Sequence, residues 1–230
     1  MPVHRSASQT AAENQRFFQK VYGWMCLSLI ISGITAYWVA SSPTVSQFIL
    51  GNPLVFIGLI ITEILLVVGM AGPLQREPSG IVAGAFVIYS FMTGLTLSVI
   101  FLIYTITSIG TTFAVTAGMF GVMSLYGYTT KKDLTSWGNV LFMALLGLIL
   151  ASIINLFLYN NVVDWIITYA GVIIFTGLTA YDTQKIRKMN IIGNEGTDED
   201  RKESIMGALR LYLDFVNLFL RLLRLFGKRR

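Results

Sequence analysis

Charged residues are scarce in this chain of 230 residues, because Asp, Glu, Lys and Arg make up only 13% of it. Soluble domains carry about 25%. The chain also has a single cysteine, Cys26, and a single histidine, His4. These counts exclude a disulfide framework and a conventional zinc site. We expect Cys26 to be a small buried apolar residue and His4 to be a solvated residue of a polar tail.

Long apolar runs take the place of the missing charge, since 54% of the residues are hydrophobic. A helix needs about 20 apolar residues to cross a hydrocarbon core about 30 Å thick. Seven candidate segments predict an all-α integral membrane protein, a seven-helix transmembrane bundle. We expect a polar N-terminal tail at 1–21, a single transmembrane domain at 22–226 and a basic tail at 227–230. The seven segments are 22–40, 53–71, 81–104, 111–129, 138–158, 163–181 and 205–225.

Basic residues follow the connections between these segments. The stretches 41–52, 105–110 and 158–163 contain no Lys or Arg, whereas the alternate connections are basic. The positive-inside rule therefore predicts a cytoplasmic N-terminus. The basic residues Arg221, Arg224, Lys228, Arg229 and Arg230 break this pattern, which leaves open whether segment seven crosses fully or is re-entrant.

Three further features of the chain follow from its polar stretches. The stretch 190–203 predicts a mobile loop. No short apolar region with a cleavage site precedes the first segment, so we expect no cleaved signal peptide. No soluble segment mixes aromatic and basic residues in the way that would predict a nucleic-acid partner.

Three acids lie inside apolar segments, where an ionised side chain costs about 2.5 kcal/mol or more. Asp182 closes the sixth segment, Asp214 lies in the seventh, and Glu63 lies in the second. We expect both aspartates in the cytoplasmic half of the bundle. Closely spaced carboxylates share their protons as a pair, so Asp182 and Asp214 are a candidate pH sensor and a candidate Ca²⁺ site. Glu63 is either a structural acid or part of the ion path, and Arg76 is either a counter-ion of Asp182 or a solvated arginine.

A polar stripe runs along the last segment. Helical spacing places its residues on one face. The stripe admits three interpretations: a helix lying on the membrane surface, a structural ion pair of Arg210 with Asp214, or the lining of a polar path through the bundle. Its residues are Arg210, Asp214, Asn217, Arg221, Arg224 and Lys228.

Two motifs carry a resemblance to a known family. They are LYLDFVNLF at 211–219 and YDTQKI at 181–186, with TGLTLS at 93–98, KDL at 132–134 and Glu63 in support. With them the chain resembles the transmembrane Bax inhibitor motif family, bacterial branch. The resemblance implies a helical bundle in the bacterial inner membrane with the last helix at its centre. It also implies a pH-sensitive calcium leak gated by Asp182 and Asp214, and an arginine after the second span that latches the first aspartate, a position matched here by Arg76.

The sequence therefore favours a pH-sensitive calcium channel or transporter without a resident cofactor, whose partners are the lipid bilayer, calcium and protons. The alternative is a non-transporting regulator of other membrane proteins, such as a membrane protease, that binds through Gly118, Gly121 and Gly127. An intramembrane aspartyl protease would need Gly-x-Gly-Asp at the second aspartate and a later Pro-Ala-Leu. This chain has Tyr-Leu-Asp and no proline after Pro78, so we expect no enzyme.

Overall fold

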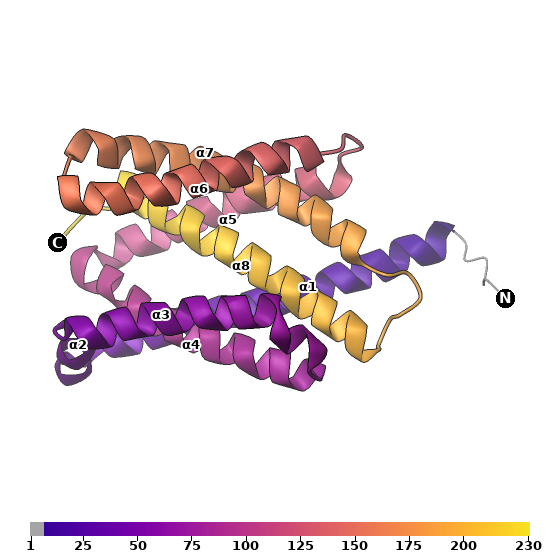
Figure 1. The fold of residues 1–230 in the computed structure, drawn as a ribbon, viewed down its shortest axis with the longest axis horizontal. Helices are drawn as coiled ribbons and strands as arrows, with labels where there is room; N and C mark the ends of the chain where they lie inside the picture. The colour runs from indigo at the N-terminus through magenta and orange to yellow at the C-terminus, as the bar shows by residue number, and fades with distance from the viewer. Residues whose placement is uncertain (1–6) are drawn as a thin grey trace. The chain divides into compact units, whose positions relative to one another are not determined.

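The computed structural model describes residues 7–230, so His4 and Arg5 lie outside the described residues. Eight α-helices and one short 3₁₀ helix, η1 (Pro73–Arg76), follow one another, and no β-strand occurs among the described residues (Figure 1). The helices are α1 (Ala7–Ser41), α2 (Pro43–Leu50), α3 (Pro53–Ala71), α4 (Ser79–Ile103), α5 (Ile106–Thr129), α6 (Thr135–Leu158), α7 (Asn161–Met189) and α8 (Asp198–Phe226).

Six helices are long and apolar enough to cross a membrane, namely α1, α3, α4, α5, α6 and α7. They confirm the first six predicted segments, and α3 matches its predicted segment at both ends. The seventh predicted segment is also helical, as α8, but α8 is not among the described helices that are long and apolar enough to cross a membrane. The all-helical membrane fold is thus confirmed, while the seventh crossing stays a prediction.

Local chemistry fixes several helix starts. The Asn52 side chain accepts a hydrogen bond from the Leu54 amide at 3.1 Å, directly before Pro53 at the first position of α3. Thr105 accepts in the same way from the Ser108 amide at 3.3 Å at the start of α5. Side-chain oxygens at this position satisfy amides that have no partner within the helix, and proline is tolerated there because its missing N–H is not needed.

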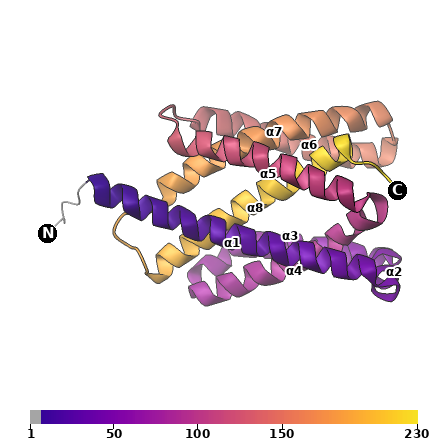
Figure 2. The same cartoon turned by 180° about the vertical axis from the view of Figure 1, so that it is seen from behind.

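The chain divides into two compact units. Unit 1 runs up to Ile103 and continues with Lys188–Tyr212, and unit 2 consists of Tyr104–Arg187 and Leu213–Arg230. Helix α8 therefore contributes its first part to unit 1 and its second part to unit 2. Within unit 1, α4 packs against both α1 and α3 (Figure 2). Gly94 permits the approach of α1, since a Cβ atom at this position would lie 2.6 Å from Cβ of Thr35.

Unit 2 is built around α7. Its buried core consists of Leu148, Ile167, Ile174, Phe175, Leu178, Leu218 and Leu222, from α6, α7 and α8. Two glycines bring α5 and α6 close to α7: a Cβ on Gly127 would lie 2.1 Å from the Ala180 carbonyl oxygen, and one on Gly138 would lie 2.3 Å from the Tyr181 ring. Of the three glycines predicted to bind partners, Gly127 thus packs inside the unit, whereas a Cβ on Gly118 or Gly121 would meet no atom within 4 Å.

Two expectations from the sequence are corrected. Cys26 is exposed on α1, not buried. The outer face of a membrane-spanning helix is itself apolar, so an apolar side chain there gains nothing from facing the protein core.

The stretch 190–203 is not a free loop either, because it docks on the N-terminal part of α1 within unit 1. The Arg16 guanidinium binds both carboxylate oxygens of Glu195, at 2.6 and 2.8 Å. Buried Asp200 accepts from Lys20 at 2.6 Å and from the Gly196 amide at 2.8 Å. Charge pairing across a large sequence separation orders a segment that its composition alone predicts to be mobile.

Candidate functional site

Asp182 lies half-buried in the last part of α7, where its neighbours in the motif anchor the helix. Thr183 donates to the Thr179 carbonyl at 2.7 Å, and its hydroxyl is hydrogen-bonded to the Ser124 hydroxyl of α5 at 2.8 Å. The Tyr181 ring covers Gly138 at the start of α6. Contacts with two neighbouring helices therefore fix the rotation of α7 at Asp182.

Gln184 joins the same part of α7 to the connection between α5 and α6. Its side-chain oxygen accepts from the Leu134 amide at 2.9 Å, and its side-chain nitrogen donates to the Lys132 carbonyl at 2.8 Å. The Arg187 guanidinium donates to the Tyr128 carbonyl at the end of α5. Tyr181, Thr183 and Gln184 thus have structural roles within unit 2.

Asp214 lies in the unit 2 part of α8 and is only 5% exposed. The following residue, Phe215, packs its ring against Phe113 and Phe120 of α5, with centroids 5.2 and 5.4 Å apart. Asp214 is therefore a buried acid, and the residue next to it joins α8 to α5 by aromatic contacts.

Asp182 and Asp214 lie on two helices, α7 and α8, that pack against each other in unit 2. The Arg224 guanidinium is paired with Asp164, and a Cβ on Gly171 would lie 3.0 Å from the Arg221 side chain. Further along α7, Leu178 shares the buried core with Leu218 of α8. The two helices are therefore antiparallel neighbours in unit 2. Asp182 follows Leu178 by one helical turn, and Asp214 precedes Leu218 by one turn, so each aspartate continues the face of its helix that packs on the other.

The remaining stripe residues of α8 fall into two groups. In unit 2, Arg221 is half-buried against Gly171, and the Asn217 side chain donates to the Leu213 carbonyl of its own helix at 2.9 Å. Arg210 belongs to unit 1. Leu211, Tyr212 and Leu218, away from the stripe, are fully buried, and Asp214 within the stripe is buried as well. A helix buried on both faces contradicts the interpretation of α8 as a helix lying on the membrane surface.

Glu63 and Arg76 belong to unit 1, apart from the unit that holds the aspartates. The Glu63 carboxylate accepts from the Thr96 hydroxyl of α4 at 2.9 Å. Arg76 is exposed at the end of η1. The hydrogen bond of Glu63 suits the structural interpretation of this acid, and a pairing of Arg76 with Asp182 stays a prediction.

No group of three or more His, Cys, Asp and Glu side chains that could hold a metal ion occurs in the described part of the chain. Resident calcium takes about six to eight oxygen ligands. Asp182 and Asp214 together have four carboxylate oxygens, fewer than that number.

Two structural features of the site escaped sequence analysis. Asp164, in the first turn of α7, pairs with Arg224 sixty positions away. Gly171 makes room for the Arg221 side chain. The spacing of α8 marks Arg221 and Arg224 as members of one face, but nothing in the sequence near Asp164 or Gly171 indicates which helix that face meets.

Comparison with known proteins gives a consistent result over almost the whole chain. Residues 14–230 match the family described as inhibitor of apoptosis-promoting Bax1. The chain is 50% identical to inner membrane protein YbhL of Escherichia coli K12, with 100% of this chain and 98% of the relative covered. It is 44% identical to an uncharacterized protein of Borreliella burgdorferi, over 94% of this chain and 93% of the relative. An uncharacterized membrane protein of Streptococcus pyogenes serotype M6 is 31% identical over 99% of each chain.

Proposed function

Because the chain belongs to the Bax inhibitor family of membrane proteins, we propose that it is a pH-sensitive calcium leak channel or transporter of the bacterial inner membrane. Protonation of the pair Asp182 and Asp214 controls its opening. Calcium and protons are its substrates, and no resident cofactor takes part.

The observation that carries this proposal is the register of α7 against α8. Three observations along the two helices support a register with the aspartate-bearing turns at the same level. They are the ion pair of Asp164 with Arg224, the approach of Arg221 to Gly171, and the core that Leu178 shares with Leu218. Two carboxylates at one level in a poorly solvated region cannot both ionise cheaply, so a proton bound by the pair holds the two helices together. Loss of that proton drives the carboxylates apart and leaves oxygens that suit a hydrated Ca²⁺ ion.

A full crossing by α8 is part of the proposal. Its 29 residues span about 43 Å, more than a hydrocarbon core of about 30 Å. The chain after α8 meets the start of α5, since the Thr105 amide donates to the Lys228 carbonyl at 3.1 Å, and Arg224 meets the start of α7. The starts of α5 and α7 follow connections that lack basic residues, on the side opposite to the predicted cytoplasmic one. These contacts favour a crossing helix over a re-entrant one.

Calcium flux into liposomes loaded with a calcium dye tests the function. We expect flux that changes between about pH 6 and 8, and Asp182→Asn and Asp214→Asn to alter its size and its pH dependence. Asp133→Asn is the matched control, because exposed Asp133 receives hydrogen bonds from Thr135 at the start of α6 and asparagine keeps an acceptor oxygen. Unchanged flux and pH dependence in both site variants would rule out the aspartate gate.

A non-transporting regulator is the second candidate. It is favoured by α3 and α6, whose apolar stretches are almost entirely unburied, and by the open surface at Gly118 and Gly121. Such helices are available to other membrane proteins as well as to lipid. Absence of calcium flux at every pH from folded protein, together with a cellular phenotype that survives both aspartate substitutions, would favour this role.

A further inference from the structure

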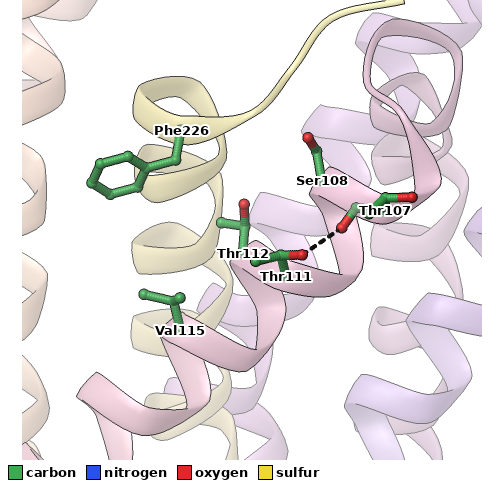
Figure 3. Close-up of a pocket in the computed structure, with 6 residues that line it drawn as sticks. All are labelled: Thr107, Ser108, Thr111, Thr112, Val115 and Phe226. Carbon is green, nitrogen blue, oxygen red and sulfur yellow. Dashed lines mark hydrogen bonds between the residues drawn. The ribbon is translucent and has the colours of Figure 1, made fainter.

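A cavity of about 380 Å³ lies in unit 2 where α5 begins and α8 ends. This volume falls within the range of about 300–1,000 Å³ that small-molecule sites occupy. Figure 3 shows the side chains of two to three turns of α5 on one side and the last turn of α8 on the other. The lining residues are Thr107, Ser108, Thr111, Thr112, Val115 and Phe226.

Two hydroxyl groups at the mouth of this cavity can donate to a ligand. The Thr111 hydroxyl donates to the Thr107 carbonyl at 2.9 Å, the dashed line of Figure 3, so its proton is already used. The Ser108 oxygen accepts from the Lys228 amide at 2.9 Å, which leaves its own proton for another acceptor. The Thr107 side chain is exposed, and its hydroxyl donates to no other described residue. Paired hydroxyl donors of this kind suit an oxygen-rich acceptor such as a phosphate.

Cations are held beside these hydroxyls. Lys228, Arg229 and Arg230 are all exposed. Their backbone is fixed by the bonds of Lys228 to Thr105 and Ser108 and by the antiparallel bridge between Tyr104 and Arg229. Asp164, the acid in the first turn of α7, is already paired with Arg224. The positive charge of the tail is therefore both anchored and unneutralised.

The cavity continues into an apolar surface. Val115 lies eight residues beyond Thr107, about 12 Å further along α5. Val115 is 45% exposed and Phe226 is 69% exposed. A polar, cationic mouth followed by exposed apolar side chains matches an amphiphile with an anionic head.

We infer that this end of unit 2 binds an anionic phospholipid, whose phosphodiester lies at Thr107, Ser108 and the 228–230 tail and whose acyl chain follows Val115 and Phe226. The site involves neither Asp182 nor Asp214 and is independent of the proposed calcium function. It gives the basic tail a role on a side of the membrane where the positive-inside rule would place few cations.

Native mass spectrometry of the full chain in detergent, with added phosphatidylglycerol or phosphatidylcholine, tests the inference. We expect preferential retention of phosphatidylglycerol, and about a tenfold or greater loss of that preference in the triple variant Lys228→Gln, Arg229→Gln, Arg230→Gln. These side chains are exposed and the substitutions leave the backbone hydrogen bonds of the tail in place. Lys131→Gln with Lys132→Gln removes exposed basic residues from the connection between α5 and α6 and should leave the preference intact.

A second pair of variants separates a built site from general attraction. Thr107→Val removes a donor and should weaken phosphatidylglycerol retention severalfold, whereas Thr111→Val removes a hydroxyl whose proton is already used and should have little effect. Equal retention of both lipids by the natural chain, or equal losses in the 228–230 and 131–132 variants, would overturn the inference. Displacement of phosphatidylglycerol by inorganic phosphate alone would also overturn it, in favour of a free-phosphate site.

Discussion

Gly127 sets the distance between α5 and α7. A side chain at this position would overlap the backbone of Ala180, two residues before Asp182. Because backbone atoms cannot rotate away as a flexible side chain can, α5 would have to move. The single missing methyl group therefore positions the helix that carries the first aspartate.

We predict that Gly127→Ala destabilises the protein by about 1–3 kcal/mol, the usual penalty for overpacking, although alanine favours helices by about 1 kcal/mol over glycine. Gly118→Ala and Gly121→Ala, on the same helix with no atom near the added methyl group, should be neutral or slightly stabilising. Thermal unfolding in detergent checks all three. Similar melting temperatures for Gly127→Ala and the two controls would contradict the assigned packing.

The connection between α7 and α8 is an element whose order depends on carboxylates. The Arg16 guanidinium holds the pKa of Glu195 below its ordinary value, and hydrogen bonds from Ser79 hold the pKa of Asp198 below its own. Groups with lowered pKa stabilise the docked connection fully above their ordinary pKa. That contribution is lost as the pH falls through the lowered values.

The connection should therefore stay docked through neutral pH and be released only below about pH 4, near the ordinary pKa of these acids. Hydrogen exchange of the Gly193 and Gly196 amides, corrected for intrinsic rates, measures this, because each donates to a carboxylate: Gly193 to Glu13 at 2.6 Å and Gly196 to Asp200 at 2.8 Å. Glu195→Gln should loosen the connection modestly at neutral pH and make little difference below about pH 4, where Glu195 itself is protonated. Release between about pH 6 and 8 would contradict this prediction and would make the connection a physiological pH sensor. Histidine is the side chain that ordinarily titrates in this range, and the connection contains none, because His4 is the single histidine of the chain.

Helix positions follow from the sequence to the extent that apolar length determines them. The segment 53–71 is predicted at both ends because Asn52 and Pro53 mark its start and Gly72 and Pro73 follow its end. The N-terminal part of α1 and the first turns of α8 are missed because they are polar. Their stability comes from partners distant in sequence, such as Lys20 with Asp200. The acids of the candidate site could be found from their rarity in apolar segments, whereas the partners of α8 depend on three-dimensional packing that no local pattern records.

For the whole molecule, the proposed topology places the two ends of the described chain on opposite sides of the membrane. A membrane-impermeant thiol reagent, added outside spheroplasts, tests this in a Cys26→Ala background, which removes the single native cysteine. We expect Arg230→Cys to react and Lys131→Cys to react only after permeabilisation. Reaction of both positions only after permeabilisation would instead favour a re-entrant α8.

The carboxamide of Gln184 has a consequence beyond its role as an anchor. The carboxamide accepts from the Leu134 amide and donates to the Lys132 carbonyl, so two hydrogen bonds join the connection at 130–134 to α7. An amide side chain can make both bonds because it carries a donor and an acceptor. Any displacement of the end of α7 must carry that connection along or break both bonds. Lys131 and Lys132 are exposed on the connection. A displacement of α7 at Asp182 would therefore move two surface lysines that molecules in the aqueous phase can bind.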